Sequence, residues 1–328
     1  MSAPIAWPRF AEIVRTHRRF LLICHVRPDC DALGSELAMA GILETLGKDV
    51  LLVNDFAVPP TLSFLNPKNK VKQLGKDLTA EQLSDREVII ILDTTAWIQL
   101  GKMADVIRQS KAIVAVLDHH VSADDLGAEL FKNTSAEATG RLVVEAADAL
   151  GVPLTAEIAE PAFAALATDT GWFRVSSTTA DTLRLAGRLV DAGAKPDLLY
   201  KQLYEHDSLA RVQLIGRTLA RARTELGGRL IHTWIERADF AATGALACDT
   251  EDIVNMTLTV DGTEVAVILV EQSNGQFKLS LRSRSEVDCS KLAETFQGGG
   301  HKKAAGATLE GPLEVAQSRV LEVVRAAM

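Results

Sequence analysis

The sequence predicts an α/β protein in which an N-terminal parallel-sheet domain is joined by a helical linker to a smaller, mixed α/β C-terminal domain. In the first half, short apolar runs rich in β-branched residues alternate with helix-like stretches, a pattern typical of a parallel sheet covered by helices on both faces. In the last third, strand-like runs flank Asn274-Gly275, a dipeptide that favours a β-hairpin. The chain of 328 residues is long enough for two domains with separate cores.

The N-terminal elements follow in chain order. Buried strands are predicted at 20–26, 49–54, 87–93 and 112–118, with helices at 32–46 and 96–110 between them. Three further helices are predicted at 137–150, 155–168 and 178–192. Gly151 is a favoured C-cap for the first of these, whereas Pro161 weakens the case for the second.

The linker is predicted at 196–227, where the pattern stays helical with few turn signals. It separates a domain at 1–195 from one at 228–328, in which strands are expected at 230–235, 264–270 and 277–282. The linker carries several arginines, which we expect on a solvated helix face rather than on nucleic acid. These arginines are Arg211, Arg217, Arg221 and Arg223.

Composition narrows the class of protein. No apolar run is long enough to span a bilayer, and the N-terminal segment lacks an apolar signal-peptide stretch, so a cytoplasmic protein is expected. The formal net charge of −8 argues against tracking long duplex DNA, although a short anionic substrate remains compatible with it. The four cysteines form no CxxC pair, so neither a zinc ribbon nor disulfides are expected, and Cys30 is expected to be a small buried hydrophobe.

Acidic and histidine clusters follow the ends of the apolar runs. Because the carboxyl ends of parallel strands share one edge of a sheet, the three clusters that follow strands are expected to converge. Carboxylates and imidazoles bind hard divalent ions, and two ions roughly 3.5–4 Å apart can clamp both oxygens of a phosphoryl displacement. The pattern therefore indicates a metal-dependent phosphoesterase. The clusters comprise His25, Asp29 and Asp31; Asp93; Asp118, His119 and His120; and Asp169.

Simpler roles remain open for single members of these clusters. Asp93 and Asp169 are each compatible with a helix N-cap. Asp118 is compatible with an acceptor that fixes the tautomer of a ligand histidine. Asp29 and Asp31, by contrast, would repel each other without a cation between them.

A second group of candidate residues lies near the C-terminus. The glycine-rich segment at 297–307 is compatible with an anion-binding nest beside Lys302 and Lys303, or with a flexible surface loop. Strand alternation would place Arg282 and Arg284 on one face, where guanidinium groups suit phosphate or base recognition.

These motifs resemble a known family. HxxxDxD, a strand-end aspartate, DHH and DTG occur in that order and resemble the DHH phosphoesterase superfamily, while RSR and GGGHKKAAG resemble its DHH-associated C-terminal domain. The two-domain size is similar to the nanoRNase/pAp phosphatase subgroup. Members of that subgroup degrade very short RNA oligonucleotides and remove the 3′-phosphate of 3′-phosphoadenosine 5′-phosphate (pAp).

The resemblance implies roles for individual residues. His25 and Asp29 would bind one metal ion and Asp31 and His119 the other, with Asp93 and Asp169 on or between both. The ions are usually manganese, with magnesium and cobalt as alternatives. Asp93 would also be catalytic, and His120 would contact the scissile phosphate and protonate the leaving group. The residues implied for the nucleotide end are Arg282, Ser283, Gly298, Gly299, Gly300 and His301.

Several functions stay open at this stage. The expected partners are short single-stranded RNA, with short DNA, pAp or dinucleotides as alternatives, and a homodimer is left open. A pyrophosphatase or exopolyphosphatase, a RecJ-like exonuclease and a cyclic- or linear-dinucleotide phosphodiesterase are the enzymatic alternatives. A nucleotide-binding regulator with structural metals is the non-enzymatic one.

Overall fold

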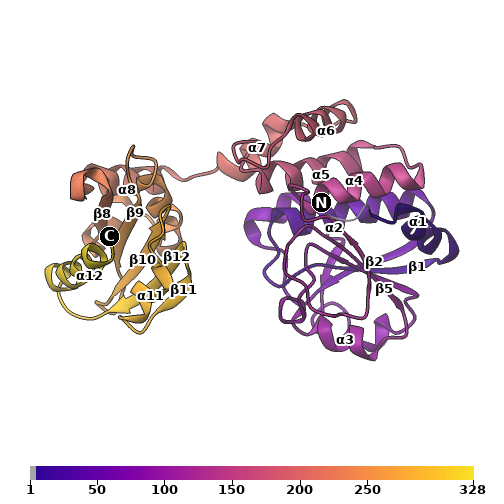
Figure 1. Cartoon of the computed structure of the whole chain (residues 1–328), viewed down its shortest axis with the longest axis horizontal. Coiled ribbons are helices and arrows are strands. Elements are labelled where there is room, and N and C mark those ends of the chain that lie inside the picture. The colour runs from indigo at the N-terminus through magenta and orange to yellow at the C-terminus, as the bar shows by residue number, and fades with distance from the viewer. Residues whose placement is uncertain (1–4) are drawn as a thin grey trace. The chain divides into compact units, whose positions relative to one another are not determined.

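The computed structural model describes residues 5–328, and the chain divides into two compact units at residues 205 and 206 (Figure 1). The division falls inside the segment predicted as a linker. Residues 1–4, which belong to the N-terminal segment examined for a signal peptide, lie outside the described residues. Across residues 5–328, no helix is both long and apolar enough to cross a membrane.

The N-terminal unit is built on a six-stranded parallel sheet with strand order β3-β2-β1-β4-β5-β6. The predicted parallel α/β architecture is confirmed. Its strands are β1 Arg19–Ile23, β2 Asp49–Asn54, β3 Val71–Gln73, β4 Val88–Leu92, β5 Ile113–Asp118 and β6 Glu129–Lys132. Its α-helices are α1 Trp7–Thr16, α2 Cys30–Thr45, α3 Met103–Gln109, α4 Thr139–Leu150, α5 Ala156–Asp169, α6 Ala180–Asp191 and α7 Pro196–Tyr204.

Burial on both faces explains why the central strands are almost continuously apolar. Along β1, Phe20 and Leu22 join the core formed with α1, α2, α4 and α5, whereas Leu21 and Ile23 join the core on the side of α3. All four side chains are fully buried. Alternate residues of a strand point to opposite faces, so a sheet between two helical layers has no polar face.

Helices α2 and α5 pack closely against each other in opposite directions. Gly34 near the start of α2 lies against Pro161 and Ala165 of α5, and Gly41 further along α2 lies against Ile158 near the start of α5. A glycine lets two helix backbones approach where a larger side chain would hold them apart. The antiparallel arrangement brings the N-terminus of α2 beside the C-terminus of α5, where candidate site residues lie.

Some predicted elements differ from the structure. The single helix predicted at 96–110 is wrong, because a 3₁₀ turn at Trp97–Leu100 is separated from α3 by Gly101, whose φ is 53°. Strands β3 and β6 were not predicted. They are three and four residues long, carry lysines, and lack the apolar run that marks the central strands.

The C-terminal unit has a mixed six-stranded sheet with strand order β11-β12-β10-β9-β8-β7. The hairpin predicted at Asn274-Gly275 is confirmed, since β9 and β10 pair antiparallel on either side of it. Helices α11 and α12 pack on one face, and α8, α9 and α10 on the other. Its strands are β7 Arg223–Glu225, β8 Leu230–Ile235, β9 Val265–Glu271, β10 Phe277–Ser283, β11 Gly299–His301 and β12 Ala304–Leu309. Its α-helices are α8 Leu209–Ala220, α9 Arg237–Thr243, α10 Ile253–Thr257, α11 Cys289–Glu294 and α12 Leu313–Ala327.

The segment predicted as a helical linker contains more than one element. Helix α7 belongs to the first unit and α8 to the second, and residues 223–225 form a strand rather than a helix. The prediction that its arginines lie on a solvated face is wrong for Arg221. Its guanidinium donates to both carboxylate oxygens of Asp239 at 2.7 Å and lies over the Trp234 ring.

We predict that Gly34→Ala destabilises the N-terminal unit by about 1–3 kcal/mol, because the added methyl group would collide with the Pro161 carbonyl oxygen. Chemical denaturation followed by circular dichroism measures the effect. Gly187→Ala is the matched control, since nothing lies within 4 Å of its added methyl group in α6. The control should stabilise the protein by about 0.5–1 kcal/mol. Equal effects of both substitutions would contradict this account of α2–α5 packing.

Candidate metal centre and substrate-binding groove

The predicted metal-binding residues converge at the C-terminal edge of the parallel sheet. His25 follows β1, Asp93 follows β4, and His119 and His120 follow β5, and these three strands are neighbours in the sheet. Their side chains form overlapping groups whose potential ligand atoms lie within 4.8 Å of one another: His25, Asp29 and Asp93; Asp31, His119 and Asp169; and Asp93, His119 and His120.

The first group gathers around His25. Its Nε2 lies 3.4 Å from Asp93 Oδ2 and 3.7 Å from Asp29 Oδ1. Its Nδ1 lies 2.9 Å from the carbonyl oxygen of Val26. Because a carbonyl only accepts, Nδ1 carries a donating proton, and Nε2 is the nitrogen that faces the carboxylates and could bind a metal ion. Asp29 is held as the N-cap of α2, where its Oδ1 accepts from the N–H of Ala32 at 3.0 Å.

The second group gathers around His119 in the same way. Its Nε2 lies 3.4 Å from Asp169 Oδ2, 3.7 Å from Asp31 Oδ2 and 3.6 Å from Asp93 Oδ1. Its Nδ1 lies 3.1 Å from the carbonyl oxygen of Ala136, so Nε2 again faces the carboxylates. Asp93 therefore borders both groups, with one carboxylate oxygen near each histidine.

These separations fit ligand atoms that share an ion. Distances of 3.4–3.7 Å between Nε2 and carboxylate oxygens are too long for hydrogen bonds. Two ligand atoms bound to one ion at about 2.1 Å, at angles near 90–110°, would lie roughly 3.0–3.5 Å apart. Burial, and then the charges of Asp93 and Asp169, raise the pKa of Asp31 well above its ordinary value. A cation removes that repulsion, so the residues present fit divalent ions.

Backbone N–H groups at the start of α4 hold Asp31. Its two oxygens accept from the N–H groups of Thr139 and Gly140 at 2.8 and 2.9 Å, and Ser35 Oγ donates at 3.1 Å. The Thr139 hydroxyl also donates to Asp93 Oδ1 at 2.8 Å. A helix N-terminus favours an anion. Sequence analysis missed Thr139, although its position at the start of a predicted helix was a usable signal.

The N-cap alternatives for two aspartates are wrong. Asp93 precedes no helix directly, and its backbone takes a φ of 64°, which is unfavourable for a non-glycine residue and is most often found at functional sites. Asp169 is the last residue of α5 rather than a cap at its start. Both carboxylates point into the cluster instead.

Asp118 organises the second histidine of the DHH motif. Its Oδ1 lies 2.8 Å from His120 Nδ1 and also accepts from the His120 backbone N–H, so His120 Nε2 is left facing outward. That hydrogen bond is the main reason why the pKa of His120 is raised. His120 is 51% exposed. Asp118 thus contacts His120, whereas the tautomer of His119 is set by a backbone carbonyl.

A partly buried lysine neutralises Asp118. Lys132 Nζ donates to Asp118 Oδ2 at 2.8 Å, to the Ser122 carbonyl at 2.7 Å and to Thr95 Oγ1 at 3.2 Å. Burial would raise the pKa of Asp118, but hydrogen bonds from His120, Lys132 and Thr95 lower it below its ordinary value. Asp118 therefore stays ionised. Lys132 lies in β6, the strand that the sequence did not predict.

A buried polar network lies next to His25, beginning at the preceding residue Cys24. Asn54 at the end of β2 accepts from the N–H of Cys24 at 2.9 Å and donates to Glu36 Oε2 at 2.8 Å. Glu36 is fully buried, and its Oε1 has no hydrogen-bond partner among the described residues. Burial raises the pKa of Glu36 to about 8, although Asn54 and Cys24 act to lower it.

The cysteines behave as predicted. All four are free, and Cys30 is buried between the two aspartates that flank it in sequence. Burial raises the pKa of the Cys30 thiol to about 12, which keeps it protonated and makes it a poor metal ligand.

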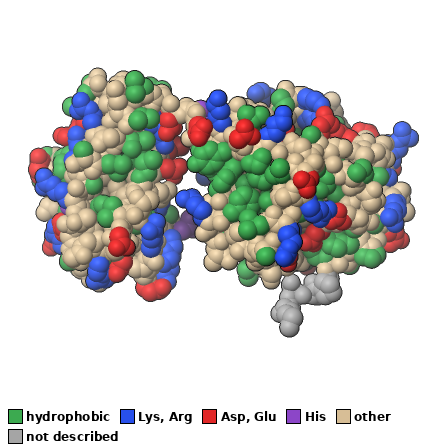
Figure 2. Space-filling model, turned by 90° about the horizontal axis from the view of Figure 1, so that it is seen from above, with side chains coloured by type: hydrophobic (Ala, Val, Ile, Leu, Met, Phe, Trp, Pro, Cys, Tyr) green, Lys and Arg blue, Asp and Glu red, His purple; other side chains and the backbone are tan. Residues whose placement is uncertain are grey.

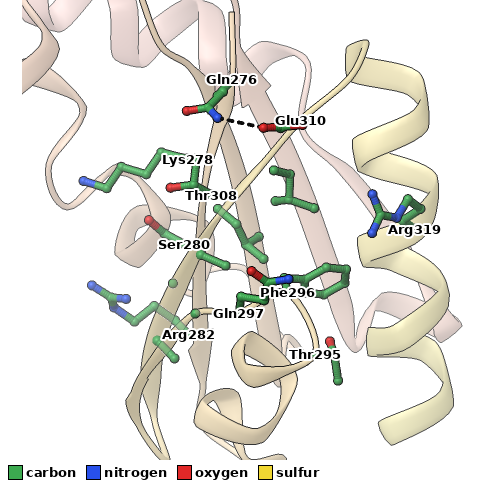
Figure 3. Close-up of a pocket in the computed structure, with 16 residues that line it drawn as sticks. Gln276, Lys278, Ser280, Arg282, Thr295, Phe296, Gln297, Thr308, Glu310 and Arg319 are labelled. Atoms are coloured by element: carbon green, nitrogen blue, oxygen red, sulfur yellow. Dashed lines mark hydrogen bonds between the residues drawn. The ribbon is translucent and has the colours of Figure 1, made fainter. Parts of the chain in front are cut away.

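The C-terminal unit contains a groove of about 1050 Å³ beside β10 and β12 (Figure 3). Lys278, Ser280 and Arg282 project from one side of β10, while Phe296 and Arg319 lie on the other side of the strands. Lys278 and Arg282 thus lie on the same polar face of β10, with Ser280 between them. Such a face suits an anionic, hydrogen-bonding ligand.

Only some of the predicted nucleotide-binding residues line this groove. Arg282 and Gly298 do, whereas Gly299, Gly300 and His301 form the exposed strand β11. Ser283 is buried, and its hydroxyl bonds to Ser285. The flexible-loop alternative for the glycine-rich segment is wrong, because β11 pairs with β12 and a methyl group on Gly300 would lie 2.6 Å from the Ala304 carbonyl oxygen.

Known proteins are similar to this chain in sequence and in fold. Residues 19–166 match the model of the DHH family, N-terminal domain, and residues 233–328 match that of the DHHA1 domain. The bifunctional oligoribonuclease and PAP phosphatase NrnA of Thermus thermophilus is 34% identical over 92% of this chain and 87% of its own length. The Bacillus subtilis protein of the same name is 29% identical over 91% of this chain and 92% of its own.

A solved structure agrees with the fold. An exopolyphosphatase-related protein from Bacteroides fragilis superposes with a TM-score of 0.84, covering 100% of this chain and 97% of that one at 24% identity. The likeness supports the two-sheet α/β architecture.

We predict that Glu36→Gln stabilises the protein most at mildly alkaline pH. An unfolded glutamate ionises near pH 4.5, whereas Glu36 in the folded protein holds its proton to about pH 8. Between these values the folded state binds more protons, so stability falls as the pH rises. The gain for Glu36→Gln at pH 8 should be about 4 kcal/mol and should vanish near pH 4.

Denaturation across pH 4–9 measures this difference. Glu81→Gln, at an exposed glutamate in the same unit, is the control and should change stability little at any pH. A pH-independent effect of Glu36→Gln would contradict the assignment of a buried, protonated carboxyl group.

Proposed function

Since this chain belongs to the DHH family of phosphoesterases and ends in a DHHA1 domain, we propose that it hydrolyses short RNA oligonucleotides to mononucleotides and removes the 3′-phosphate of pAp. The printed names of the two NrnA relatives, which align over nine tenths of this chain, support both activities. The enzyme class is that of hydrolases acting on phosphoester bonds.

The observation that carries the proposal is the position of Asp93, whose carboxylate oxygens lie 3.4 Å from His25 Nε2 and 3.6 Å from His119 Nε2. His25 and Asp29 would hold one divalent ion, and Asp31, His119 and Asp169 the other, with Asp93 between them. When bound, two such ions lower the pKa of an attacking water and neutralise charge on the phosphate. Manganese is the proposed metal, because the candidate ligands are four aspartates and two histidines, and a set dominated by carboxylates suits it.

The remaining residues would handle the leaving group. His120 holds a proton through its hydrogen bond to Asp118 and presents Nε2 outward, so it can protonate the departing oxygen. Lys132 keeps Asp118 ionised and fixed, which fixes the direction of His120 in turn. Thr139 orients both Asp31 and Asp93 from one position.

The groove of the C-terminal unit would bind the nucleotide that is not being cleaved. Arg282, Lys278 and Ser280 offer donors along one strand face, and an arginine there can bind a phosphate or a base edge. The roles of Ser283 and of residues Gly298–His301 in holding the nucleotide end remain part of this proposal.

Product release tests the function directly. With manganese present, phosphate release from pAp and mononucleotide release from 5′-labelled RNAs of two to fifty nucleotides would be measured. Turnover of pAp and of the shortest RNAs, with a decline for longer ones, is the expected outcome. Inactivity on both substrates, with activity on pyrophosphate or cyclic dinucleotides, would assign the metal centre to a different reaction.

We predict that Asp93→Asn lowers turnover at least about 1000-fold, because the two oxygens of Asp93 face the two candidate ligand histidines. Calorimetry with Mn²⁺ should show weaker binding and a lower stoichiometry than in the parent protein. Asp105→Asn, at an exposed aspartate of α3, is the control and should keep both properties. Normal manganese binding in Asp93→Asn would refute the ligand assignment.

We predict that Arg282→Ala raises KM for short RNA by about 10–100-fold with little change in kcat, the loss expected for one charge-assisted hydrogen bond. Arg237→Ala, at an exposed arginine of the same unit, should leave KM unchanged. A fall in kcat with constant KM would instead place Arg282 at the reacting phosphate.

A further inference from the structure

Aromatic side chains cluster beside the metal-binding residues of the N-terminal unit. The Trp172 ring lies 5.0 Å from that of Tyr200 and 5.7 Å from that of Tyr204, edge to face in both cases. The two tyrosine rings lie 4.9 Å apart. The tryptophan follows α5, and both tyrosines belong to α7. None of these residues has a role in the metal centre described above.

The cluster is connected to the predicted ligands through the chain and through the hydrophobic core. Trp172 comes three residues after Asp169. Trp172 and Leu203, which precedes Tyr204 in α7, pack against the hydrophobic core that includes Cys30. Cys30 stands between Asp29 and Asp31 in the chain. The aromatic cluster therefore shares a core with the start of α2, where the candidate ligands Asp29 and Asp31 are held.

An unusual backbone presents Trp172 to the tyrosines. Gly171, Trp172 and Phe173 have φ values of 54°, 60° and 63°, so three successive residues are left-handed. The conformation is unfavourable for bulky residues and persists only where the surroundings impose it. Here the Trp172 ring packs edge-on against buried Phe163 at 6.1 Å. The turn thus places a rigid aromatic support immediately after a candidate metal ligand.

The tyrosines keep substantial exposed surface. Tyr204 is 47% exposed and Tyr200 is 39% exposed, although both contact Trp172. Figure 2 looks onto the side that carries α6 and α7 and shows hydrophobic side chains gathered on that face of the N-terminal unit. Rings that served only to anchor α7 would gain most from full burial. An exposed ring face beside a phosphate site instead suits a flat ligand.

We propose that Tyr204, supported edge-on by Trp172, stacks against the nucleobase of the nucleotide whose phosphate lies at the metal centre. The inference rests on the proposed function in that the ligand is a nucleotide. Bases unstacked from a single strand are commonly bound on aromatic side chains, and one such contact is worth about 1–3 kcal/mol. Stacking is tolerant of base identity, so the site would accept any RNA sequence and favour purines.

A binding cycle between protein and ligand tests this contact without requiring hydrolysis. AMP and ribose 5-phosphate differ only by the base, and their dissociation constants would be measured by calorimetry with Mn²⁺ present. In the parent protein AMP should bind at least about 10-fold more tightly than ribose 5-phosphate. In Tyr204→Ala that ratio should fall to within about 2-fold, while the affinity for ribose 5-phosphate stays unchanged.

Two variants control the cycle. Tyr204→Phe keeps the ring and should keep the AMP preference. Leu198→Ala removes an exposed apolar side chain from the same helix and should also keep it. An AMP preference that persists in Tyr204→Ala, or its absence from the parent protein, would overturn the stacking assignment.

Failure of the proposed hydrolytic activity and failure of the stacking site give different results. If the parent protein hydrolyses neither dinucleotides nor pAp, yet shows the Tyr204-dependent preference for AMP, the activity is wrong and the stacking site stands. If dinucleotides are hydrolysed at equal rates by the parent and Tyr204→Ala and the AMP ratio is unchanged, the activity stands and the stacking site falls.

Discussion

The N-terminal unit depends on one electrostatic constraint: several carboxylates are held together at the edge of a sheet where the interior on both sides is apolar. Asp31 and Asp93 are almost fully buried, and like charges at this range oppose each other's ionisation. The start of α4 offsets part of the repulsion through N–H groups and the Thr139 hydroxyl. Divalent ions would offset the rest. The packing of α2, α4 and α5 therefore positions the same carboxylates that would bind the ions.

The sequence predicted what depends on short-range pattern. The central strands, the order of the clusters and the ligand types could be read from apolar runs that end in aspartate or histidine, because parallel strands bring their carboxyl ends to one edge. Contacts between distant segments could not be predicted in this way. Thr139 reaches Asp31 across 108 positions and Lys132 reaches Asp118 from a four-residue strand without an apolar run. The glycine-rich segment was ambiguous because pairing of β11 with β12 depends on backbone approach rather than on side chains.

The proposed function divides recognition of the substrate between chemically different surfaces. Metal ions at the candidate centre would attract a phosphate whatever its ester. The groove of the C-terminal unit supplies donors from β10, and the exposed rings of α7 supply an apolar face. In that proposal the rings of α7 would bind the base of the nucleotide at the metal centre, and the groove of the C-terminal unit would bind a neighbouring nucleotide. A preference for nucleotides over inorganic phosphoanhydrides would then come from these two surfaces rather than from the ions.

Both candidate ligand histidines are tied through Nδ1 to a backbone carbonyl, Val26 in one case and Ala136 in the other. This hydrogen bond restricts rotation of each imidazole before any ion binds. The entropic cost of ordering the ring is therefore part of the free energy of folding rather than of metal binding. The coordination geometry is encoded in main-chain atoms, which substitution of neighbouring side chains leaves in place. Substitution of side chains around the centre would therefore leave both imidazoles oriented toward the carboxylates.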